Sequence, residues 1–249
     1  MGYGWGNGVP RRYFDEKHWA NPLKWNARAA RDGVRRRVFC GSMCDIFDNE
    51  VDDFWRRKVG ALIDVTPHLD WLLTTKRIGN AERMLADMLP GPMRPNVWLI
   101  ATMVNQEEID RDMEKLVRLP AVVHGVSIEP MLGPVDLLRC KRLPSWVIAG
   151  FESEQPGHQP RCGYPAWLRS LRDQCAVADI AFHFKQFGAW GPAPEGMAMR
   201  EVVAWAKGKP ICVLTSGQVM VRLGAKNTGN LLDGRQHLEF PTPAAGIAP

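Results

Sequence analysis

The chain has 249 residues, with 32 Lys and Arg against 27 Asp and Glu, so its formal net charge is +5. With 45% hydrophobic residues it can bury a substantial core, which excludes disorder for the bulk of the molecule. No apolar run reaches the roughly 18 residues of a membrane-spanning helix, and the first residues contain no apolar secretion signal. We therefore expect a globular protein of the cytoplasm with no membrane partner.

Six cysteines are dispersed along the chain, a density too low for a disulfide scaffold, so reduced thiols are expected. Only Cys40 and Cys44 lie close together in sequence. Two cysteines alone cannot complete a tetrahedral metal site, and no matching pair or spaced histidine motif follows. The spacing therefore argues against a zinc site.

In chain order, short apolar runs alternate with longer segments that have the hydrophobic periodicity of helices. Each short run is continuously apolar, which is typical of parallel strands buried on both faces. The predicted strands cover residues 37–42, 71–75, 97–102, 122–128, 146–150 and 181–185. The predicted helices cover residues 52–65, 80–89, 106–119 and 165–178. Asn105 is placed to cap the third helix, and Pro165 suits the first turn of the fourth.

This alternation predicts an α/β fold, a parallel sheet with right-handed crossovers that is either open and doubly wound or curled into a barrel. After residue 187 the pattern changes to loop and a short helix. Two short β runs around Gly217 and Gln218 then predict a hairpin. We therefore predict a β/α core over residues 1–187 and an extension over residues 188–249 that contains the hairpin and a frayed tail.

Polar side chains follow every predicted strand. In parallel β/α folds, ligands bind beyond the carboxyl ends of the strands. Glu129 follows a buried strand directly and Lys185 ends an apolar run, and a charge so close to a core normally has a partner. We therefore favour a shared polar ligand site over solvated strand ends, which stay the alternative. The candidate residues are Ser42, Asp45, Lys76, Arg77, Thr102, Glu129, Glu152, Ser153, Lys185 and Gln186.

Other catalytic patterns are weaker. His124 and His183 lie inside apolar runs, where a hydrogen-bonded core histidine is expected more often than a catalytic base. Ser42 lacks the Gly-x-Ser-x-Gly context of an acyl-transfer nucleophile. The glycines near the start follow no strand, so they do not form a dinucleotide-binding fingerprint.

Basic residues cluster at Arg11–Arg12 and at Arg35, Arg36 and Arg37. The arginines could contact phosphates while neighbouring tryptophans stack on bases. The same residues could instead form a solvated face, and a net charge of +5 is small for a nucleic-acid-binding protein. Both interpretations stay open. The tryptophans concerned are Trp5, Trp19 and Trp25.

Several strings resemble, in order along the chain, the motifs of one known family. These strings are RRVFCGSMCDIF, LLTTKR, NVWLIAT, SIEPMLGPVDLL, WVIAGFES, LRDQC and FHFKQFGAWGP. The stretch GNLLDGRQHLEFP is similar to that family's C-terminal signature, so the resemblance extends over residues 13–241. The family is an uncharacterised group of phage and prophage proteins with three clustered cysteines. Its members are often encoded beside a three-Cys-motif partner protein.

The resemblance implies an enzyme of the radical S-adenosylmethionine type, built on a partial β/α barrel of TIM type. Three cysteines would hold a [4Fe-4S] cluster that reduces S-adenosylmethionine, and the deoxyadenosyl radical would take a hydrogen atom from the substrate.

The resemblance also implies roles for the strand-end residues. Ser42 and Asp45 would lie near the cofactor's amino group, and Thr102 and Glu129 near its ribose. Glu152 would lie near the adenine, with the adjacent Ser153 also among the cofactor-binding residues. The residues expected to face the substrate or a carboxylate are Lys76, Arg77, Lys185 and Gln186.

The chain departs from this pattern at the cysteines. It contains no C-x3-C-x2-C triplet, and the family's cluster precedes the region where this chain begins. We therefore expect either a start assigned too late or a member that has lost the cluster, and no radical chemistry from the chain as given. Val104 stands where an acid is common in the family, and Phe151 and Glu154 replace glycines expected around Glu152.

Two functions follow from these observations. The first is a phage-type barrel protein that modifies a nucleic acid or a nucleotide-linked substrate in a bacterial host. The second is a non-catalytic nucleic-acid-binding protein that keeps the barrel as a scaffold. A metal-independent hydrolase built on Asp45, Glu129 and Glu152 lacks a recognisable nucleophile.

Overall fold

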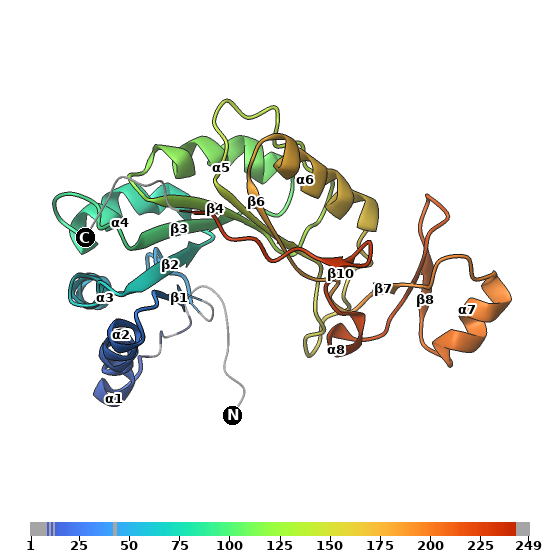
Figure 1. Ribbon diagram of the computed structural model, residues 1–249, viewed down its shortest axis with the longest axis horizontal. Helices are drawn as coiled ribbons and strands as arrows, with labels where there is room; N and C mark the ends of the chain where they lie inside the picture. Colours follow the sequence, from blue (N-terminus) through green and yellow to red (C-terminus); the bar gives the residue numbers. More distant parts are fainter. Residues whose placement is uncertain (1–8, 10, 12, 42–43, 243–249) are drawn as a thin grey trace. The chain divides into compact units, whose positions relative to one another are not determined.

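The structure is a computed structural model that describes residues 9, 11, 13–41 and 44–242 (Figure 1). It has a mixed α/β fold with a six-stranded sheet of the partial-barrel kind, as predicted. Hydrogen-bonded neighbours follow the chain in the order β1-β2-β3-β4-β5-β6. The strands are β1 (Arg36–Cys40), β2 (Leu69–Thr75), β3 (Val97–Thr102), β4 (Val123–Ile128), β5 (Trp146–Gly150) and β6 (Ala181–Gln186).

All six predicted strands are present, and β3 and β5 have the predicted bounds. Strand β1 ends earlier than expected, at Cys40. The next residue, Gly41, has a φ of +97°, which is outside the extended region, and a Cβ at this position would lie 2.6 Å from Thr74 Oγ1. Close packing against β2 therefore ends the strand at this glycine.

The four predicted helices are also confirmed. They are α3 (Asp53–Asp64), α4 (Ala81–Met88), α5 (Gln106–Arg118) and α6 (Pro165–Val177). As expected, the side chain of Asn105 caps α5, accepting a hydrogen bond from the backbone N–H of Glu108 at 2.9 Å, and Pro165 lies in the first turn of α6. No helix within the described ranges has the length and apolar character needed to cross a membrane.

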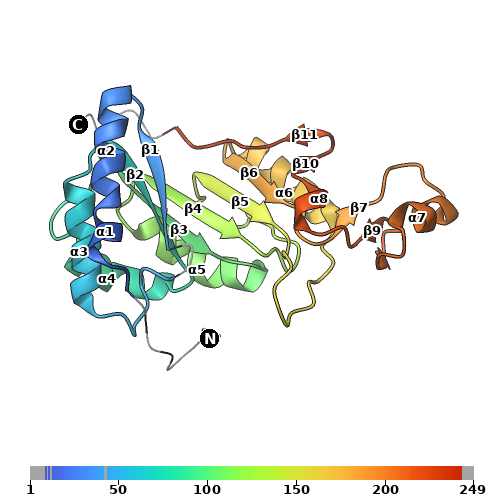
Figure 2. The same ribbon diagram turned by 90° about the horizontal axis from the view of Figure 1, so that it is seen from below.

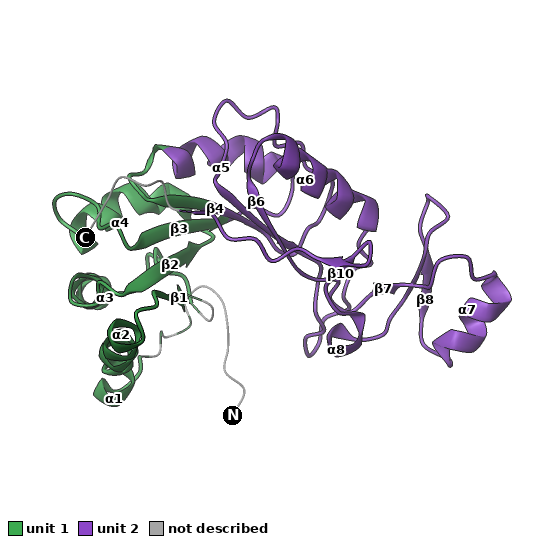
Figure 3. Ribbon diagram, in the orientation of Figure 1, with its two compact units in different colours: residues 1–101, 118–124, 243–249 green, residues 102–117, 125–242 purple. Residues whose placement is uncertain are grey.

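The chain divides into two compact units (Figure 3). The first comprises residues 1–101, 118–124 and 243–249, and the second comprises residues 102–117 and 125–242. The sequence-based division after residue 187 follows a change of pattern along the chain, and it stays a prediction.

In the first unit, α3 and α4 pack against each other. A short 3-10 helix, η1 (Ile78–Asn80), leads into α4. Two further helices, α1 (Glu16–Trp19) and α2 (Asn21–Asp32), precede β1 and were not predicted. Helix α2 packs against β1 and β2. Only Pro22 and Ala29 of α2 are buried, and its larger apolar side chains, Leu23 and Trp25, are exposed.

In the second unit, α6 packs against β5 and β6. The final described segment pairs with β6, where the N–H of Phe184 donates to the carbonyl of His237 at 2.8 Å (Figure 2). This pairing occupies the outer edge of β6, which would otherwise expose unpaired backbone groups. The elements that lead into the segment are α8 (Ala225–Thr228), β10 (Leu231–Leu232) and β11 (Arg235–Gln236).

The predicted hairpin is confirmed. It consists of β8 (Ile211–Val213) and β9 (Val219–Val221), and Gly217 adopts a φ of +83° in the turn. Strand β7 (Gly191–Pro192) pairs with β9 to give a three-stranded antiparallel sheet. The helix α7 (Met199–Ala206) buries Val202 and Ala206 against Val221.

Replacing Gly60 by Ala should lower the free energy of unfolding by about 1–3 kcal/mol. This loss is expected even though Ala is more favourable than Gly in a helix interior by about 1 kcal/mol. Gly60 is buried in α3, and a Cβ there would lie 2.0 Å from the carbonyl oxygen of Met88. Urea denaturation measures the free energy of unfolding of the variant and of the unchanged protein. Gly79→Ala is the matched control, because nothing lies within 4 Å of a Cβ at that position. Equal stability of the two variants would contradict the prediction.

Candidate functional site

The strand register of the second unit decides which side chains share a face. Ser127 of β4 is level with Ile148 of β5, which is level with His183 of β6. Neighbours in parallel strands point to the same side, so these residues share one face. Residues of opposite parity, such as Val126 and Val147, are completely buried and belong to the helix-covered face.

Three polar side chains of the first face converge at the carboxyl ends of β4 and β6. The hydroxyl of Ser127 donates to Glu129 Oε2 at 3.3 Å, and Lys185 Nζ lies 3.4 Å from Glu129 Oε1. A Cβ at Gly150 would lie 3.0 Å from the same Oε1, so the carboxylate lies over the end of β5. We call Ser127, Glu129, Gly150 and Lys185 the polar cluster.

Glu129 and Lys185 differ in exposure. The side chain of Glu129 is 18% exposed, whereas that of Lys185 is 57% exposed. The carboxylate is therefore partly shielded while the ammonium group is largely in water. An ion pair of this kind contributes little to the free energy of unfolding. Glu129 and Lys185 can therefore separate and each contact a ligand at a small cost in free energy.

His183 lies on the same face, two residues before Lys185. Its ring lies near Trp146 and Phe240, with centroids 6.1 and 5.5 Å away. Burial, followed by the charge of Lys185, lowers the pKa of His183 below its usual value. The sequence favoured a hydrogen-bonded core histidine over a catalytic base at this position. The ring is half-buried, and among the described residues its Nδ1 has no hydrogen-bond partner.

Glu152 has a different environment. Its carboxylate accepts hydrogen bonds from the backbone N–H of Arg161 at 2.7 Å and from the guanidinium of the same residue, and His158 Nε2 lies 3.3 Å away. The guanidinium of Arg161 is the main cause that lowers the pKa of Glu152 to about 2. Glu152 therefore holds the loop of residues 152–161 in place. Its neighbour Ser153 accepts a hydrogen bond from Gln186 Nε2 at 2.6 Å.

In the first unit, Asp45 is saturated in a similar way. It accepts hydrogen bonds from Thr75 Oγ1 at 2.7 Å, from the backbone N–H of Lys76 at 2.8 Å and from Arg77 Nη1 at 3.1 Å. The N–H of Phe47 donates to it as well, at 3.0 Å. Asp45 thus ties its own loop to the end of β2.

The predicted site residues fall into two groups, one in each unit. Of the strand-end candidates, Asp45, Lys76 and Arg77 belong to the first unit, and the others that the structure describes belong to the second. Thr102 is half-buried at the end of β3, and Ser42 lies outside the described residues. The prediction that all of these residues line one common mouth stays a prediction.

The arginines of the basic cluster have internal contacts. Arg35 donates to Asp70 Oδ1 through two nitrogens, at 2.9 and 2.6 Å, and Arg36 donates to Asp32 at 2.8 Å. Arg37 lies over the ring of Trp98, 5.4 Å from its centroid. All three are exposed, so the acids only partly neutralise the cluster. Their contact with nucleic acid stays a prediction.

The described residues do not fit an iron–sulfur cluster. No group of three or more His, Cys, Asp or Glu in the described part of the chain is arranged to hold a metal. Burial raises the pKa of the Cys40 thiol to about 12, so the thiolate that iron requires is disfavoured. We therefore derive no chemical step through a cluster.

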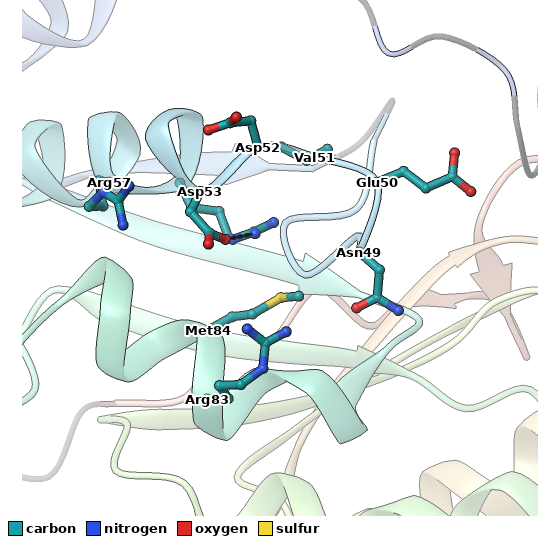
Figure 4. A pocket seen from close by; sticks show the side chains of 9 residues that line it. Asn49, Glu50, Val51, Asp52, Asp53, Arg57, Arg83 and Met84 are labelled. Carbon is teal, nitrogen blue, oxygen red and sulfur yellow. Dashed lines mark hydrogen bonds and ion pairs between the residues drawn. The ribbon is translucent and has the colours of Figure 1, made fainter.

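Two cavities lie away from the predicted residues. One of about 620 Å³ lies between the segment 49–53 and α4, and the arginines and acids that line it include the ion pair of Arg56 with Asp53 (Figure 4). The other, of about 780 Å³, lies in the second unit beside the start of β6 and the final described segment. No strand-end candidate lines either cavity.

Sequence reasoning missed several residues of these clusters. Gly150, Arg161 and Ser127 were not among the candidate residues. Gly150 at the last position of an apolar strand was a usable signal for close packing. Arg161 offered none, because its partnership with Glu152 depends on the path of the intervening loop.

The family model described as "Protein of unknown function (DUF5131)" matches residues 2–241 of the chain. The chain belongs to this family. No curated protein and no solved structure matches it. The support for the candidate site of this DUF5131 member therefore comes from the residues of this chain alone.

Glu152→Gln should lower stability at neutral pH, and the loss should disappear in acid. The pKa of Glu152 is about 2 in the folded protein against an ordinary 4.5, so the ionised carboxylate stabilises the fold above about 4.5 and this contribution is lost as pH falls towards 2. The midpoints of urea unfolding of the unchanged protein and of Glu152→Gln, compared from neutral pH down towards pH 2, measure this contribution. The exposed Glu195→Gln is the control, and a difference independent of pH would contradict the assignment.

Proposed function

We propose that this DUF5131 member binds a nucleoside ligand of the S-adenosylmethionine type at the polar cluster. The observation that supports the proposal is the convergence of Ser127, Glu129 and Lys185 at the carboxyl ends of β4 and β6. Ligands of parallel β/α folds bind at this end of the strands. The cluster offers an acceptor for hydroxyl or ammonium donors and a cation for a carboxylate.

The chemistry of the cluster favours a nucleoside over a nucleotide. The partly shielded carboxylate of Glu129 can accept hydrogen bonds from the two ribose hydroxyls. The same negative charge repels phosphate. Lys185 is exposed, with a flexible side chain that can pair with the carboxylate of the methionine part. S-adenosylmethionine contains both a ribose diol and a carboxylate, so it suits this pair of charges.

The wider proposal follows the sequence resemblance. We propose a phage-type barrel protein of radical S-adenosylmethionine ancestry that acts on a nucleic acid or nucleotide-linked substrate, with a three-Cys-motif protein as a partner. The role assigned to this chain's described residues is to bind and orient the nucleoside.

Titration calorimetry with S-adenosylmethionine tests the proposal. We expect binding of this ligand and of S-adenosylhomocysteine, with weaker binding of ATP because of its phosphates. Glu129→Gln should raise the dissociation constant about tenfold or more, since a hydrogen bond to a charged acceptor is removed. Glu195→Gln removes the same charge from an exposed loop and should change nothing.

Two results would contradict the proposal. One is the absence of binding to the folded protein. The other is unchanged affinity in Glu129→Gln together with a melting temperature lowered by several degrees, which would indicate that Glu129 serves only as the structural partner of Lys185.

A second candidate function is binding of nucleic acid by the basic cluster. Its support is that Arg35, Arg36 and Arg37 are exposed and consecutive, at and just before the start of the terminal strand of the sheet. In this case the barrel serves as a scaffold and no catalysis is required.

Replacing Arg35, Arg36 and Arg37 by Ala should then flatten the dependence of DNA affinity on salt, by about one unit of slope for each phosphate that the protein no longer neutralises. Fluorescence anisotropy at several salt concentrations measures this slope. Replacement of Lys141, Arg142 and Arg200, which are exposed elsewhere, is the control. An unchanged slope in a variant that still folds would remove these arginines from any nucleic-acid site.

A further inference from the structure

The cavity of about 620 Å³ in the first unit is lined by three arginines that come from two packed helices. Arg56 and Arg57 lie on α3, and Arg83 lies on α4. Figure 4 shows the side chain of Arg83 extending from α4 towards the first turn of α3, with Asn49 on the loop that leads into α3. Guanidinium and amide donors from three separate segments therefore line one hollow.

Three acids also line this cavity, and each of them is engaged by another group. Glu50 Oε2 lies 3.1 Å from Arg11 Nη2. Asp52 caps α3, because its Oδ1 accepts a hydrogen bond from the backbone of the first helical turn at 2.8 Å. Asp53 forms an ion pair with Arg56. None of these contacts involves the other two arginines of the cavity.

Those two arginines are available to an anion. Arg57 Nη1 donates to both carboxylate oxygens of Asp87, at 2.9 and 3.0 Å, but the two side chains are 54% and 41% exposed. An exposed pair of this kind contributes little to the free energy of unfolding, so a competing anion can replace Asp87 at a small cost. Arg83 is exposed and makes no hydrogen bond or ion pair with a described residue. Its guanidinium group therefore has N–H donors to offer to a ligand.

Arg56 gives the cavity a buried positive charge. Its side chain is 3% exposed, and its Nη1 donates to the carbonyl of Asp48 at 2.9 Å while Nη2 pairs with Asp53. Its Nε has no hydrogen-bond partner among the described residues. An anion nearby stabilises a guanidinium group that is removed from water and incompletely hydrogen-bonded. The hydrogen bond from Arg56, together with the charges of Arg57 and Arg83, lowers the pKa of Asp53, as expected at a positive potential.

We propose that this cavity binds the phosphate group of a small organic phosphate monoester, with Arg57, Arg83 and Asn49 donating hydrogen bonds to its oxygens. The planar fork of a guanidinium group matches two phosphate oxygens at once. The amide oxygen of Asn49 accepts from Asn80 Nδ2 at 3.0 Å, whereas its NH₂ group donates to no described residue and is available to the ligand. Arg56 stabilises the bound anion through its charge.

Shape and charge favour a phosphate monoester over other anions. Donors from three segments can surround a tetrahedral group, whereas a carboxylate is planar and offers two oxygens. A monoester carries about 1.5 to 2 negative charges at neutral pH, against one for each phosphodiester of a nucleic acid. The volume of about 620 Å³ is far larger than the roughly 30 Å³ that one water molecule occupies in the liquid, so it leaves room for the organic group.

Titration calorimetry of the full chain with phenyl phosphate, in a buffer free of phosphate, tests the proposal. We expect saturable binding of phenyl phosphate and of inorganic phosphate, and weaker binding of benzoate, which has the same ring with a planar group of single charge. Arg83→Ala should raise the dissociation constant of phenyl phosphate about tenfold or more, because charge-assisted hydrogen bonds are removed. Arg83→Lys should recover only part of this loss, since it keeps the charge without the fork.

Arg28→Ala is the matched control and should leave the dissociation constant unchanged. Arg28 is an exposed arginine of α2 in the same unit, and it does not line the cavity. Circular dichroism checks that each variant is folded, and the titration of the unchanged protein does not depend on any variant.

Four results would overturn the proposal. The first is the absence of saturable phenyl phosphate binding to the folded protein. The second is an equal effect of Arg83→Ala and Arg28→Ala, which would indicate non-specific attraction by charge. The third is benzoate binding as tight as that of phenyl phosphate, and the fourth is binding of a DNA oligonucleotide without binding of phenyl phosphate. Phenyl phosphate contains no nucleoside, so its binding can succeed or fail independently of the function proposed for the polar cluster.

Discussion

The alternation of side chains across parallel strands is the constraint on which the candidate site depends. Ser127, Ile148 and His183 are in register, so the hydroxyl and imidazole groups project from one face of β4–β6. Val126 and Val147 are buried on the opposite, helix-covered face. A slip of one residue would bury the polar groups under α6 and expose the valines. The apolar core of the second unit and the placement of its polar cluster are therefore two consequences of one register.

The acids at the strand ends divide into two kinds. Asp45 and Glu152 are surrounded by backbone N–H groups and guanidinium groups of their own unit, and each fastens a loop. Glu129 instead faces a solvent-exposed lysine and a hydroxyl, with Gly150 beneath it. Asp45 and Glu152 therefore have a structural role, because groups of their own unit fill their acceptor positions. Glu129 is the acid to which the proposed ligand contact is assigned.

The β/α alternation could be predicted well because both of its signals are local. Continuous apolar runs marked the strands, and residues such as Asn105 and Pro165 marked helix ends. Helix α2 was not predicted, and only Pro22 and Ala29 of its residues are buried. The partnership of Glu152 with Arg161 was not predicted either, since it depends on where the intervening loop folds back.

The sequence by itself determined the order and type of the core elements and the fact that charged residues follow the strands, because hydrophobic period and chain-breaking residues are properties of short segments. Only the tertiary structure decided which of those charges are neutralised by a partner. It also separated the strand-end residues into two units. The physical reason is that the distance between remote residues depends on the summed packing of the whole chain, which no single segment encodes.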